Sequence, residues 1–187
     1  MMPDALPETI LQFGTGKFLR GFADLLAHEA NQGDQPAGRV VVLQSTGTER
    51  SAAFKRQGCR FHVAIRGLEA GRRVDEVVEV GSVSRALAAA CDWDEVLRLA
   101  VSPSLGTIIS NTTEAGYALD DSDAPGAVPP RSFPAKLLRV LQARHEAGLP
   151  GVAVLPCELL EDNADRLLGL VAEQARRWGW SASLTGW

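Results

Sequence analysis

Four short apolar runs, separated by segments with helical periodicity, constrain the fold of this chain more than any other feature. The runs are Thr9–Phe13, Val40–Gln44, Gly106–Ser110 and Gly151–Pro156. A strand that is buried on both faces has such a continuous apolar sequence, and strands that alternate with amphipathic helices form a parallel sheet. We therefore predict an α/β fold, with a doubly wound, mainly parallel sheet and helices on both of its faces.

The remaining segments supply the helices and one further feature. Apolar residues recur at helical spacing in five segments, at 18–30, 84–90, 92–101, 133–145 and 163–178. Two half-exposed strands, Cys59–Gly67 and Arg72–Val80, flank a turn and predict an inserted β-hairpin. Asn163 is expected to cap the last helix, and Asp120–Arg131, which lacks periodicity, is expected to be a loop.

Length, composition and charge limit the classes of protein to which the chain can belong. The chain has 187 residues, enough for one sizeable domain, with 45% hydrophobic and 22% charged residues, as in a soluble globular protein. The net charge is −4 and basic residues are scattered, which argues against a nucleic-acid partner. No apolar run approaches the roughly 20 residues that span a membrane. The N-terminal sequence MMPDALPETI lacks the layout of a signal peptide, so we expect a cytoplasmic protein without a membrane partner.

The cysteines and histidines do not suggest a metal site. Cys59, Cys91 and Cys157 are too few and too dispersed for a disulfide framework or a zinc cluster, so we expect three reduced thiols. His28 and His145 lie on predicted helices and are expected at the surface.

In a doubly wound sheet, ligands bind outside the carboxyl ends of the strands. That rule selects four places in this sequence, namely Gly14–Leu19, Gln44–Thr48, Ser110–Glu114 and Pro156–Asn163.

The first place contains a glycine pattern typical of dinucleotide binding. A pyrophosphate needs backbone N–H groups at a helix start and a backbone without an obstructing side chain. Gly14 can form the tight turn and Gly16 can allow close approach, while Leu19 replaces the usual third glycine. Lys17 and Arg20 add positive charge nearby. The alternative is an ordinary strand-to-helix turn.

The second place leaves the choice of dinucleotide open. A carboxylate after the second strand would favour NAD, but the chain reads LQSTGTER, with no acid before Glu49 and with Arg50 following it. Ser45, Thr46 and Thr48 can bond either a hydroxyl group or a phosphate.

The third and fourth places each have a functional and a structural interpretation. Asn111 or Thr112 could face a ligand, or cap a helix that has a glutamate in its first turn. Cys157 could be a nucleophile, but no histidine lies near it in sequence, and a small core thiol fits better. The acidic residues Glu158, Glu161 and Asp162 could hold a metal, but a solvated loop before the helix cap fits them better.

Four segments in this order, FGTGKFLRGF, SNTTEAG, FPAKLLRVL and LPCELLEDN, resemble the N-terminal half of the long-chain polyol dehydrogenase (mannitol dehydrogenase) family. The fingerprint of that family is G-x-G-x-F-x-R, which Gly14, Gly16, Phe18 and Arg20 match. SNTTEAG and PCEL look most like its tagaturonate reductase (altronate oxidoreductase) branch. The resemblance spans roughly residues 10–178.

The resemblance implies a Rossmann-like domain that binds NAD, without excluding NADP, for hydride transfer between D-tagaturonate and D-altronate in hexuronate catabolism. By the same resemblance, a sugar acid would lie near Arg20, Glu158 and Asn163, and Glu114 is the one catalytic candidate. The implied cofactor contacts are Phe13, Gly14, Thr15, Gly16, Lys17, Phe18, Leu19, Gln44, Ser45, Thr46, Asn111, Thr112 and Thr113.

The chain departs from the family in two ways. Family members are much longer, and their acid/base lysine lies in a second, mostly helical domain. We therefore expect residues 1–187 to be the dinucleotide-binding domain alone, without its C-terminal partner domain. Leu159 stands where mannitol dehydrogenases have an asparagine, so the oxyanion role of that residue is not transferred. The alternatives are a fructuronate reductase or polyol dehydrogenase, a dinucleotide-binding module without activity, and an interaction domain.

Overall fold

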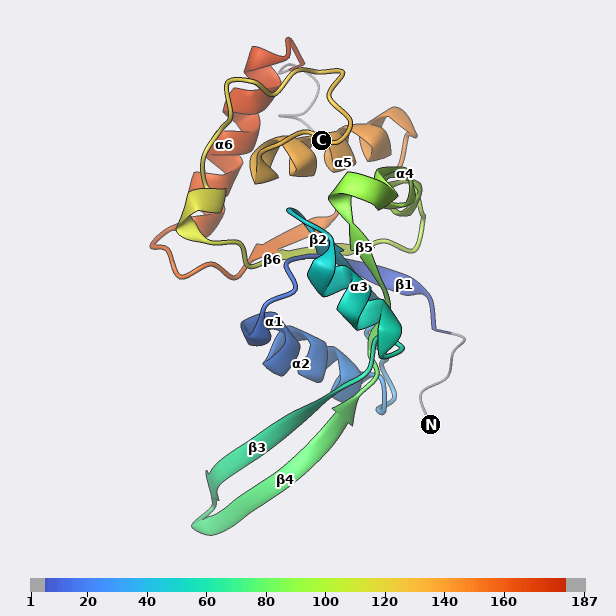
Figure 1. Ribbon diagram of the computed structural model, residues 1–187, viewed down its shortest axis with the longest axis vertical. Coiled ribbons are helices and arrows are strands. Elements are labelled where there is room, and N and C mark those ends of the chain that lie inside the picture. Colours follow the sequence, from blue (N-terminus) through green and yellow to red (C-terminus); the bar gives the residue numbers. More distant parts are fainter. Residues whose placement is uncertain (1–5, 181–187) are drawn as a thin grey trace.

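The computed structural model describes residues 6–180, which form a parallel sheet between two layers of helices (Figure 1). The strand order is β5-β2-β1-β6-β7, and every neighbouring pair is parallel. The predicted doubly wound fold is confirmed. The strands are β1 (Glu8–Phe13), β2 (Arg39–Gln44), β5 (Val83–Ala88), β6 (Thr107–Ser110) and β7 (Ala153–Pro156).

Helices from the two halves of the chain cover opposite faces of the sheet (Figure 1). The first half supplies α1 (Lys17–Gly21), α2 (Ala23–Ala30) and α3 (Glu49–Arg56). The second half supplies α4 (Ala89–Ala100), α5 (Phe133–Glu146) and α6 (Asn163–Arg177).

The central strands are apolar on both faces because both faces are covered. Leu11 and Phe13 of β1 belong to the core under α4, α5 and α6, whereas Ile10 packs with Phe54 and Ala27 on the other face. Strand β2 divides in the same way, because successive side chains of a strand point to opposite faces. This double burial explains the mainly apolar sequences of β1 and β2, in which Gln12 and Gln44 are buried polar exceptions.

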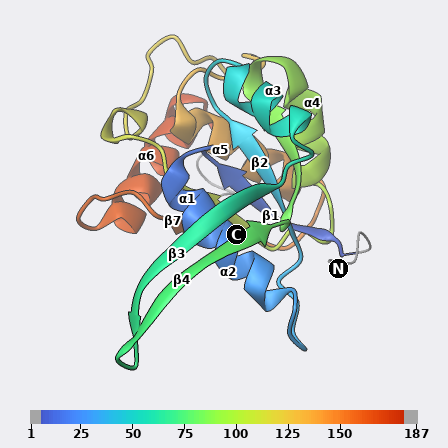
Figure 2. The same ribbon diagram turned by 60° about the horizontal axis from the view of Figure 1, so that its bottom comes forward.

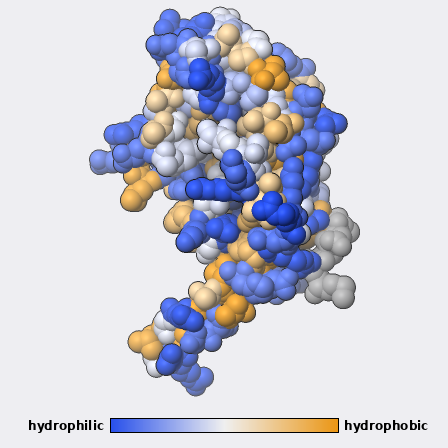
Figure 3. All heavy atoms as spheres, in the orientation of Figure 1, coloured by the Kyte–Doolittle hydropathy of each residue, from blue (hydrophilic) through white to orange (hydrophobic). Residues whose placement is uncertain are grey.

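The predicted hairpin is present and projects from the body of the molecule (Figures 1 and 2). Strands β3 (Phe61–Glu69) and β4 (Arg72–Val80) are antiparallel, and Ala70 and Gly71 form the turn with positive φ angles. Phe61 and Val80 at its base are buried in the core, whereas the far end is exposed and largely hydrophilic (Figure 3).

The predicted helix at 84–90 is wrong. Residues Val83–Ala88 form β5, which pairs in parallel with β2, and only Ala89 and the residues after it are helical. The sequence SRALAAA has high helix propensity, but pairing with the buried β2 overrides it. The sheet therefore has five strands in the described part of the chain, where the sequence indicated four.

Two other helices differ from the prediction. The helix expected over 18–30 is divided at Phe22, whose backbone (φ −125°, ψ −79°) is not helical. Helix α3 was not predicted, because its sequence ERSAAFKR is mostly polar and buries only Ser51 and Phe54. The remaining predicted elements agree with the structure to within a few residues at their ends.

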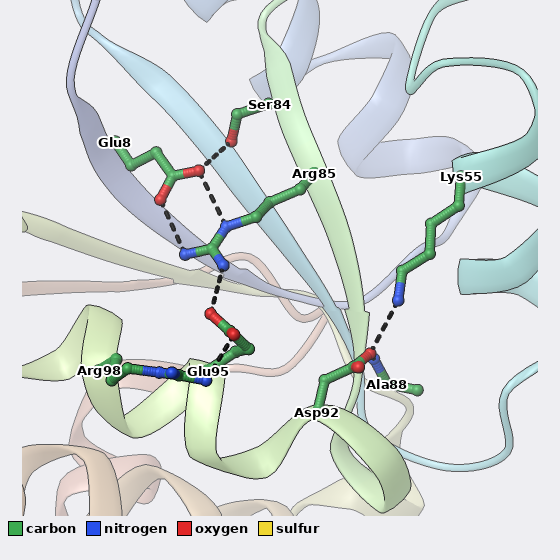
Figure 4. A network of polar contacts seen from close by, with 8 residues as sticks. All are labelled: Glu8, Lys55, Ser84, Arg85, Ala88, Asp92, Glu95 and Arg98. Carbon is green, nitrogen blue, oxygen red and sulfur yellow. Dashed lines mark hydrogen bonds and ion pairs between the residues drawn. The ribbon is translucent and has the colours of Figure 1, made fainter.

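A polar network ties β1 to β5 and α4 (Figure 4). The Arg85 guanidinium donates to both oxygens of Glu8, at 2.9 Å each, and to Glu95 at 2.8 Å. Beside it, Lys55 of α3 forms an ion pair with Asp92 of α4 at 3.0 Å. These contacts lie partly in solvent, so they orient the elements more than they stabilise them.

His28 is buried, so its predicted place at the surface is wrong. The residue is 7% exposed, and its Nδ1 accepts a hydrogen bond from the Gly81 N–H at 3.2 Å. One turn earlier on α2, Asp24 has no solvent exposure. Helix α2 therefore packs a polar pair against the sheet and the end of β4.

Asp24→Asn is expected to stabilise the protein at alkaline pH. Burial raises the pKa of Asp24 from 3.8 to about 7, against the smaller, opposite effects of Gln12 and Arg20. Between these values the native state binds more protons than the unfolded state, so the carboxyl lowers stability as the pH rises from about 4 to 7. We expect the free energy of unfolding of the variant, relative to that of the wild type, to be about 2 kcal/mol higher at pH 8 than at pH 4.5. Urea unfolding at both pH values measures this difference, and identical pH profiles would contradict it.

Candidate functional site

An open cleft of about 1170 Å³ lies at the carboxyl ends of β1, β2 and β6. Its walls are the turn after β1, the loops after β2 and β6, and the start of α5 together with the loop before it. The lining residues are Gly14, Thr15, Gly16, Gln44, Ser45, Thr46, Glu49, Arg50, Asn111, Thr112, Thr113, Ala115, Gly116, Ala118, Leu119, Asp120, Asp121, Arg131, Ser132, Phe133 and Lys136.

The two glycines of the turn have different environments. Gly14 has a φ of +127°, and a Cβ there would lie 2.9 Å from the Asn111 carbonyl oxygen, so the fold itself needs glycine. Gly16 has ordinary extended angles (φ −69°, ψ 160°), and a Cβ there would meet no protein atom within 4 Å. Folding therefore does not require glycine at position 16, and the space beside Gly16 opens into the cleft.

The other predicted turn residues divide into two groups. Thr15 lines the cleft with the glycines, but Phe13 is buried and packs edge-on against Phe133 at 5.1 Å. Leu19 is also fully buried, and Lys17 and Phe18 are exposed outside the cleft lining. Phe13 and Leu19 therefore support the turn from behind.

Arg20, predicted to border a substrate, points away from the cleft lining. Its guanidinium lies 5.8 Å from the ring centres of both Phe54 and Phe61. Contacts of a cation with aromatic faces are stabilising when they are partly buried. In this structure Arg20 therefore joins α1 to α3 and the base of the hairpin.

The loop after β2 is shaped by Gln44. Its amide donates to the Thr46 carbonyl at 2.7 Å, and its oxygen accepts from the Ser51 N–H at 2.7 Å. Gln44 thus uses both ends of its amide within the loop. The hydroxyl of Ser45 is buried without a hydrogen-bond partner among the described residues, and Ser45 lines the cleft. A bound ligand would satisfy such a group.

The loop after β6 does not form the capped α-helix that the sequence allowed. It ends in a single 3-10 turn, η1 (Glu114–Gly116), without a side-chain cap. Asn111 instead donates to the Cys157 carbonyl at 2.5 Å, while Thr112 and Thr113 line the cleft with it. Glu114 is exposed and does not line the cleft, although Ala115 and Gly116 do.

In the acidic segment after β7, Glu161 and Asp162 are exposed, as expected of a solvated loop, but Glu158 is not. Glu158 is 5% exposed, and its carboxylate accepts hydrogen bonds from Ser110, Thr112 and Tyr117. Asp162, in a left-handed conformation, is the N-cap of α6, so the predicted cap at Asn163 is wrong. The Asn163 amide donates to the carbonyls of Pro156 and Glu158, at 3.0 Å each. Over residues 6–180, no group of three or more metal-ligating side chains is close enough to hold a metal ion.

No functional role was predicted for the basic residues of the α5 wall. Lys136 is buried, and its ammonium donates to the Arg131 carbonyl at 2.5 Å. Burial lowers the pKa of Lys136 below its ordinary value. Its position between Ala135 and Leu137 on an apolar helix face is the signal that could have revealed it.

The three cysteines are free thiols, as predicted. Burial, followed by the charge of Glu158, raises the pKa of the Cys157 thiol. Because a nucleophilic cysteine needs a lowered pKa, this environment does not favour a catalytic thiol.

The sequence that forms this glycine turn, cleft and β6-loop wall matches a known domain family. The model of the mannitol dehydrogenase Rossmann domain matches residues 8–185. The chain belongs to the mannitol dehydrogenase family. The resemblance found in the G-x-G-x-F-x-R fingerprint is thereby confirmed.

Curated relatives of this mannitol dehydrogenase Rossmann domain include two proteins named altronate oxidoreductase. The protein from Bacillus subtilis (strain 168) is 36% identical over 185 residues, and the one from Yersinia enterocolitica (serotype O:8 / biotype 1B) is 38% identical over 186 residues. Each alignment covers 97% of this chain. The chain spans 38% of the length of each of these relatives.

Solved structures share the fold. Pseudomonas fluorescens mannitol 2-dehydrogenase, in a ternary complex with NAD and D-mannitol, has a TM-score of 0.77 at 21% identity, over 96% of this chain and 38% of that one. A substrate-free D-sorbitol dehydrogenase has a TM-score of 0.76 at 23% identity, over 93% of this chain and 39% of that one. At these identities the likeness establishes the Rossmann-like fold alone.

Within the described residues, no helix is both long and apolar enough to span a bilayer.

Proposed function

We propose that this domain binds NAD(H) for an oxidoreductase that interconverts D-tagaturonate and D-altronate. The observation that carries the proposal is the open space beside Gly16, at the carboxyl edge of a Rossmann-like sheet. The names of the matched relatives favour the altronate pair over fructuronate or a free polyol. The family and the fold favour a nicotinamide dinucleotide as cofactor.

The cleft residues fit the parts of such a cofactor. The pyrophosphate would lie against Gly16, where the first N–H groups of α1 have no intrahelical partner. The adenosine would lie over the loop after β2, where Ser45 and Thr46 line the cleft. The nicotinamide would face the wall formed by Asn111, Thr112 and Thr113. The bound cofactor supplies the hydride.

Reduction of a ketone also needs a proton donor at the developing alkoxide and walls that exclude water. Among the described residues, Lys136 lines the cleft, but its ammonium is engaged by the Arg131 carbonyl, and Glu114 lies outside the lining. We propose that the proton donor and the sugar-acid site come from polypeptide corresponding to the rest of the relatives, of which this chain spans 38%.

The 187-residue chain is expected to bind NADH and to reduce no tagaturonate on its own. Isothermal titration calorimetry with NADH tests the first part, and NADH oxidation in the presence of tagaturonate tests the second. Absence of NADH binding would refute the proposed cofactor site. Turnover by the isolated chain would refute the proposal that the proton donor and the sugar-acid site come from other polypeptide.

We expect NADH to bind at least about 10-fold more tightly than NADPH, because a carboxylate at the adenosine ribose disfavours a 2′-phosphate. Glu49 lines that part of the cleft, and hydrogen bonds from its own N–H and that of Thr48 lower its pKa, so it is charged at neutral pH. Glu49→Gln should reduce the preference, whereas Glu114→Gln, outside the cleft lining, should preserve it. Parallel titrations with both dinucleotides measure the ratio. Equal affinities in the wild type would show that Glu49 does not select NAD.

A further inference from the structure

Glu158 is a buried carboxylate immediately after β7, directly behind the wall of the cleft. It does not line the cleft itself, and its side chain points back toward the loop after β6. The two loops belong to neighbouring parallel strands, β6 and β7. The side chain therefore bridges the ends of two strands at the carboxyl edge of the sheet.

Both oxygens of the carboxylate are fully used. One oxygen accepts from the Thr112 N–H at 2.8 Å and the Thr112 hydroxyl at 3.2 Å. The other accepts from the Ser110 hydroxyl at 3.1 Å and the Tyr117 hydroxyl at 3.0 Å. All four donors are uncharged. A buried carboxylate is tolerated when its oxygens are hydrogen-bonded in this way.

The donors lie before, within and after the wall segment of the loop that follows β6. Ser110 is the last residue of β6, Thr112 lines the cleft, and Tyr117 follows η1. The Asn111 N–H donates to the Phe13 carbonyl of β1 at 3.0 Å, but from Thr112 to η1 the chain has no helical or strand assignment. Burial, and then the charge of Glu158, raise the pKa of Tyr117, so its hydroxyl remains a donor. The wall is thus held from the β1 side at Asn111 and from the β7 side at Thr112.

We propose that Glu158 is a positioning residue that holds the Asn111–Thr113 wall in place for the nicotinamide half of the cofactor, and that it acts through hydrogen-bond geometry. This inference rests on the proposed function. It assigns Glu158 no contact with the sugar acid. The adenosine half of the cofactor would lie on β1 and β2, and among the described residues none of the hydrogen-bond donors to Glu158 belongs to these strands.

Two substitutions distinguish the effect of side-chain length at position 158 from the effect of its charge. Glu158→Gln keeps the length of the side chain and loses the charge. Its amide oxygen can still accept from Thr112, and its NH₂ group can donate to the hydroxyls of Ser110 and Tyr117, since hydroxyls also accept. Glu158→Asp keeps the charge, but it is one methylene shorter and cannot hold both sets of donors.

The test compares the affinities of NADH and ADP-ribose for the wild type and both variants by calorimetry. ADP-ribose contains the adenosine and pyrophosphate but lacks the nicotinamide. Glu158→Asp is expected to weaken NADH binding by about 10-fold, the effect of losing a buried hydrogen-bond acceptor, and to leave ADP-ribose binding within about 2-fold. Glu158→Gln is expected to stay within about 3-fold of the wild type for both ligands.

The outcomes are distinct. Weak NADH binding by Glu158→Gln with normal binding by Glu158→Asp would show that charge matters, and would overturn the inference. Equal losses for NADH and ADP-ribose in Glu158→Asp would indicate general disruption and would also overturn it. If the wild type binds ADP-ribose but gains nothing from the nicotinamide, the inference fails while the dinucleotide site stands. If the wild type binds neither ligand, the proposed function fails first. Should Glu158→Asp not fold, Tyr117→Phe removes one of the donors, and an unchanged ratio of the two affinities would then overturn the inference.

Discussion

Gly16→Val is expected to weaken NADH binding at least about 100-fold, or about 2.7 kcal/mol, while leaving the fold intact. The backbone angles at Gly16 are open to any residue, and the added side chain would meet no protein atom near its Cβ. The valine would instead occupy the space that the pyrophosphate needs, because the second glycine of a dinucleotide turn allows the backbone to approach the phosphates. Calorimetric titration with NADH measures the loss, and thermal unfolding confirms the fold.

Two other glycines serve as controls for this prediction. Gly21, at the end of α1, also has open space around its Cβ position but does not line the cleft, so Gly21→Val should bind NADH normally. Gly14→Val should destabilise the protein, because the position combines a positive φ with close approach to the Asn111 carbonyl. Wild-type affinity in Gly16→Val would show that the pyrophosphate does not lie at this turn.

The sequence predicted those parts of the fold in which local pattern and tertiary environment agree. The strands β1, β2, β6 and β7 were identified because their sequences are mainly apolar, as expected of β1 and β2, which are buried on both faces, although the edge strand β7 is only partly buried. Strand β5 was missed because Ser84 and Arg85 interrupt it and its alanines favour a helix. Arg85 is accommodated in the strand by ion pairs with Glu8 and Glu95, which are distant in sequence and were not predictable from it.

The candidate site divides in a similar way. The ends of the strands and the glycine turn identified where the cleft lies, since topology alone brings these segments together. The direction of each side chain could not be predicted. Arg20 turns under α1 toward two aromatic rings, and Glu158 turns inward to hydrogen-bond donors on the neighbouring loop. Both orientations depend on packing between elements that are not adjacent in sequence.

Arg144 shows how a buried charge can stabilise this domain through backbone carbonyls, without an ion pair to a carboxylate within residues 6–180. It lies on α5, is 2% exposed, and donates to three backbone carbonyls, those of Pro150 at 2.6 Å, Ala100 at 3.1 Å and Ser102 at 2.9 Å. Ala100 is the last residue of α4, so the guanidinium satisfies carbonyls at a helix C-terminus, where a positive charge is favourable. Burial lowers its pKa, but an arginine remains protonated at any physiological pH.

Arg144→Met is expected to lower the free energy of unfolding by about 3–4 kcal/mol. Methionine has a similar stem but no donor. It leaves the carbonyls of Pro150 and Ala100 with reduced access to water, at a cost of about 1–3 kcal/mol each, whereas the Ser102 carbonyl keeps the Leu105 N–H at 3.2 Å. Arg144→Lys should recover part of the loss, because an ammonium is a donor but lacks the planar fork that reaches three acceptors at once. Urea unfolding of the three proteins at pH 7 measures these differences.

Arg98→Met is the matched control, since Arg98 lies on α4, has a side chain that is 66% exposed and pairs only with Glu95 among the described contacts. Exposed ion pairs contribute little, so this variant should lie within about 0.5 kcal/mol of the wild type. If Arg144→Met also unfolds within about 1 kcal/mol of the wild type, water must replace the guanidinium at the three carbonyls at little cost. The junction of α4 with α5 would then be stabilised by its apolar side chains, Leu99, Leu105 and Val140 among them, and not by the buried arginine.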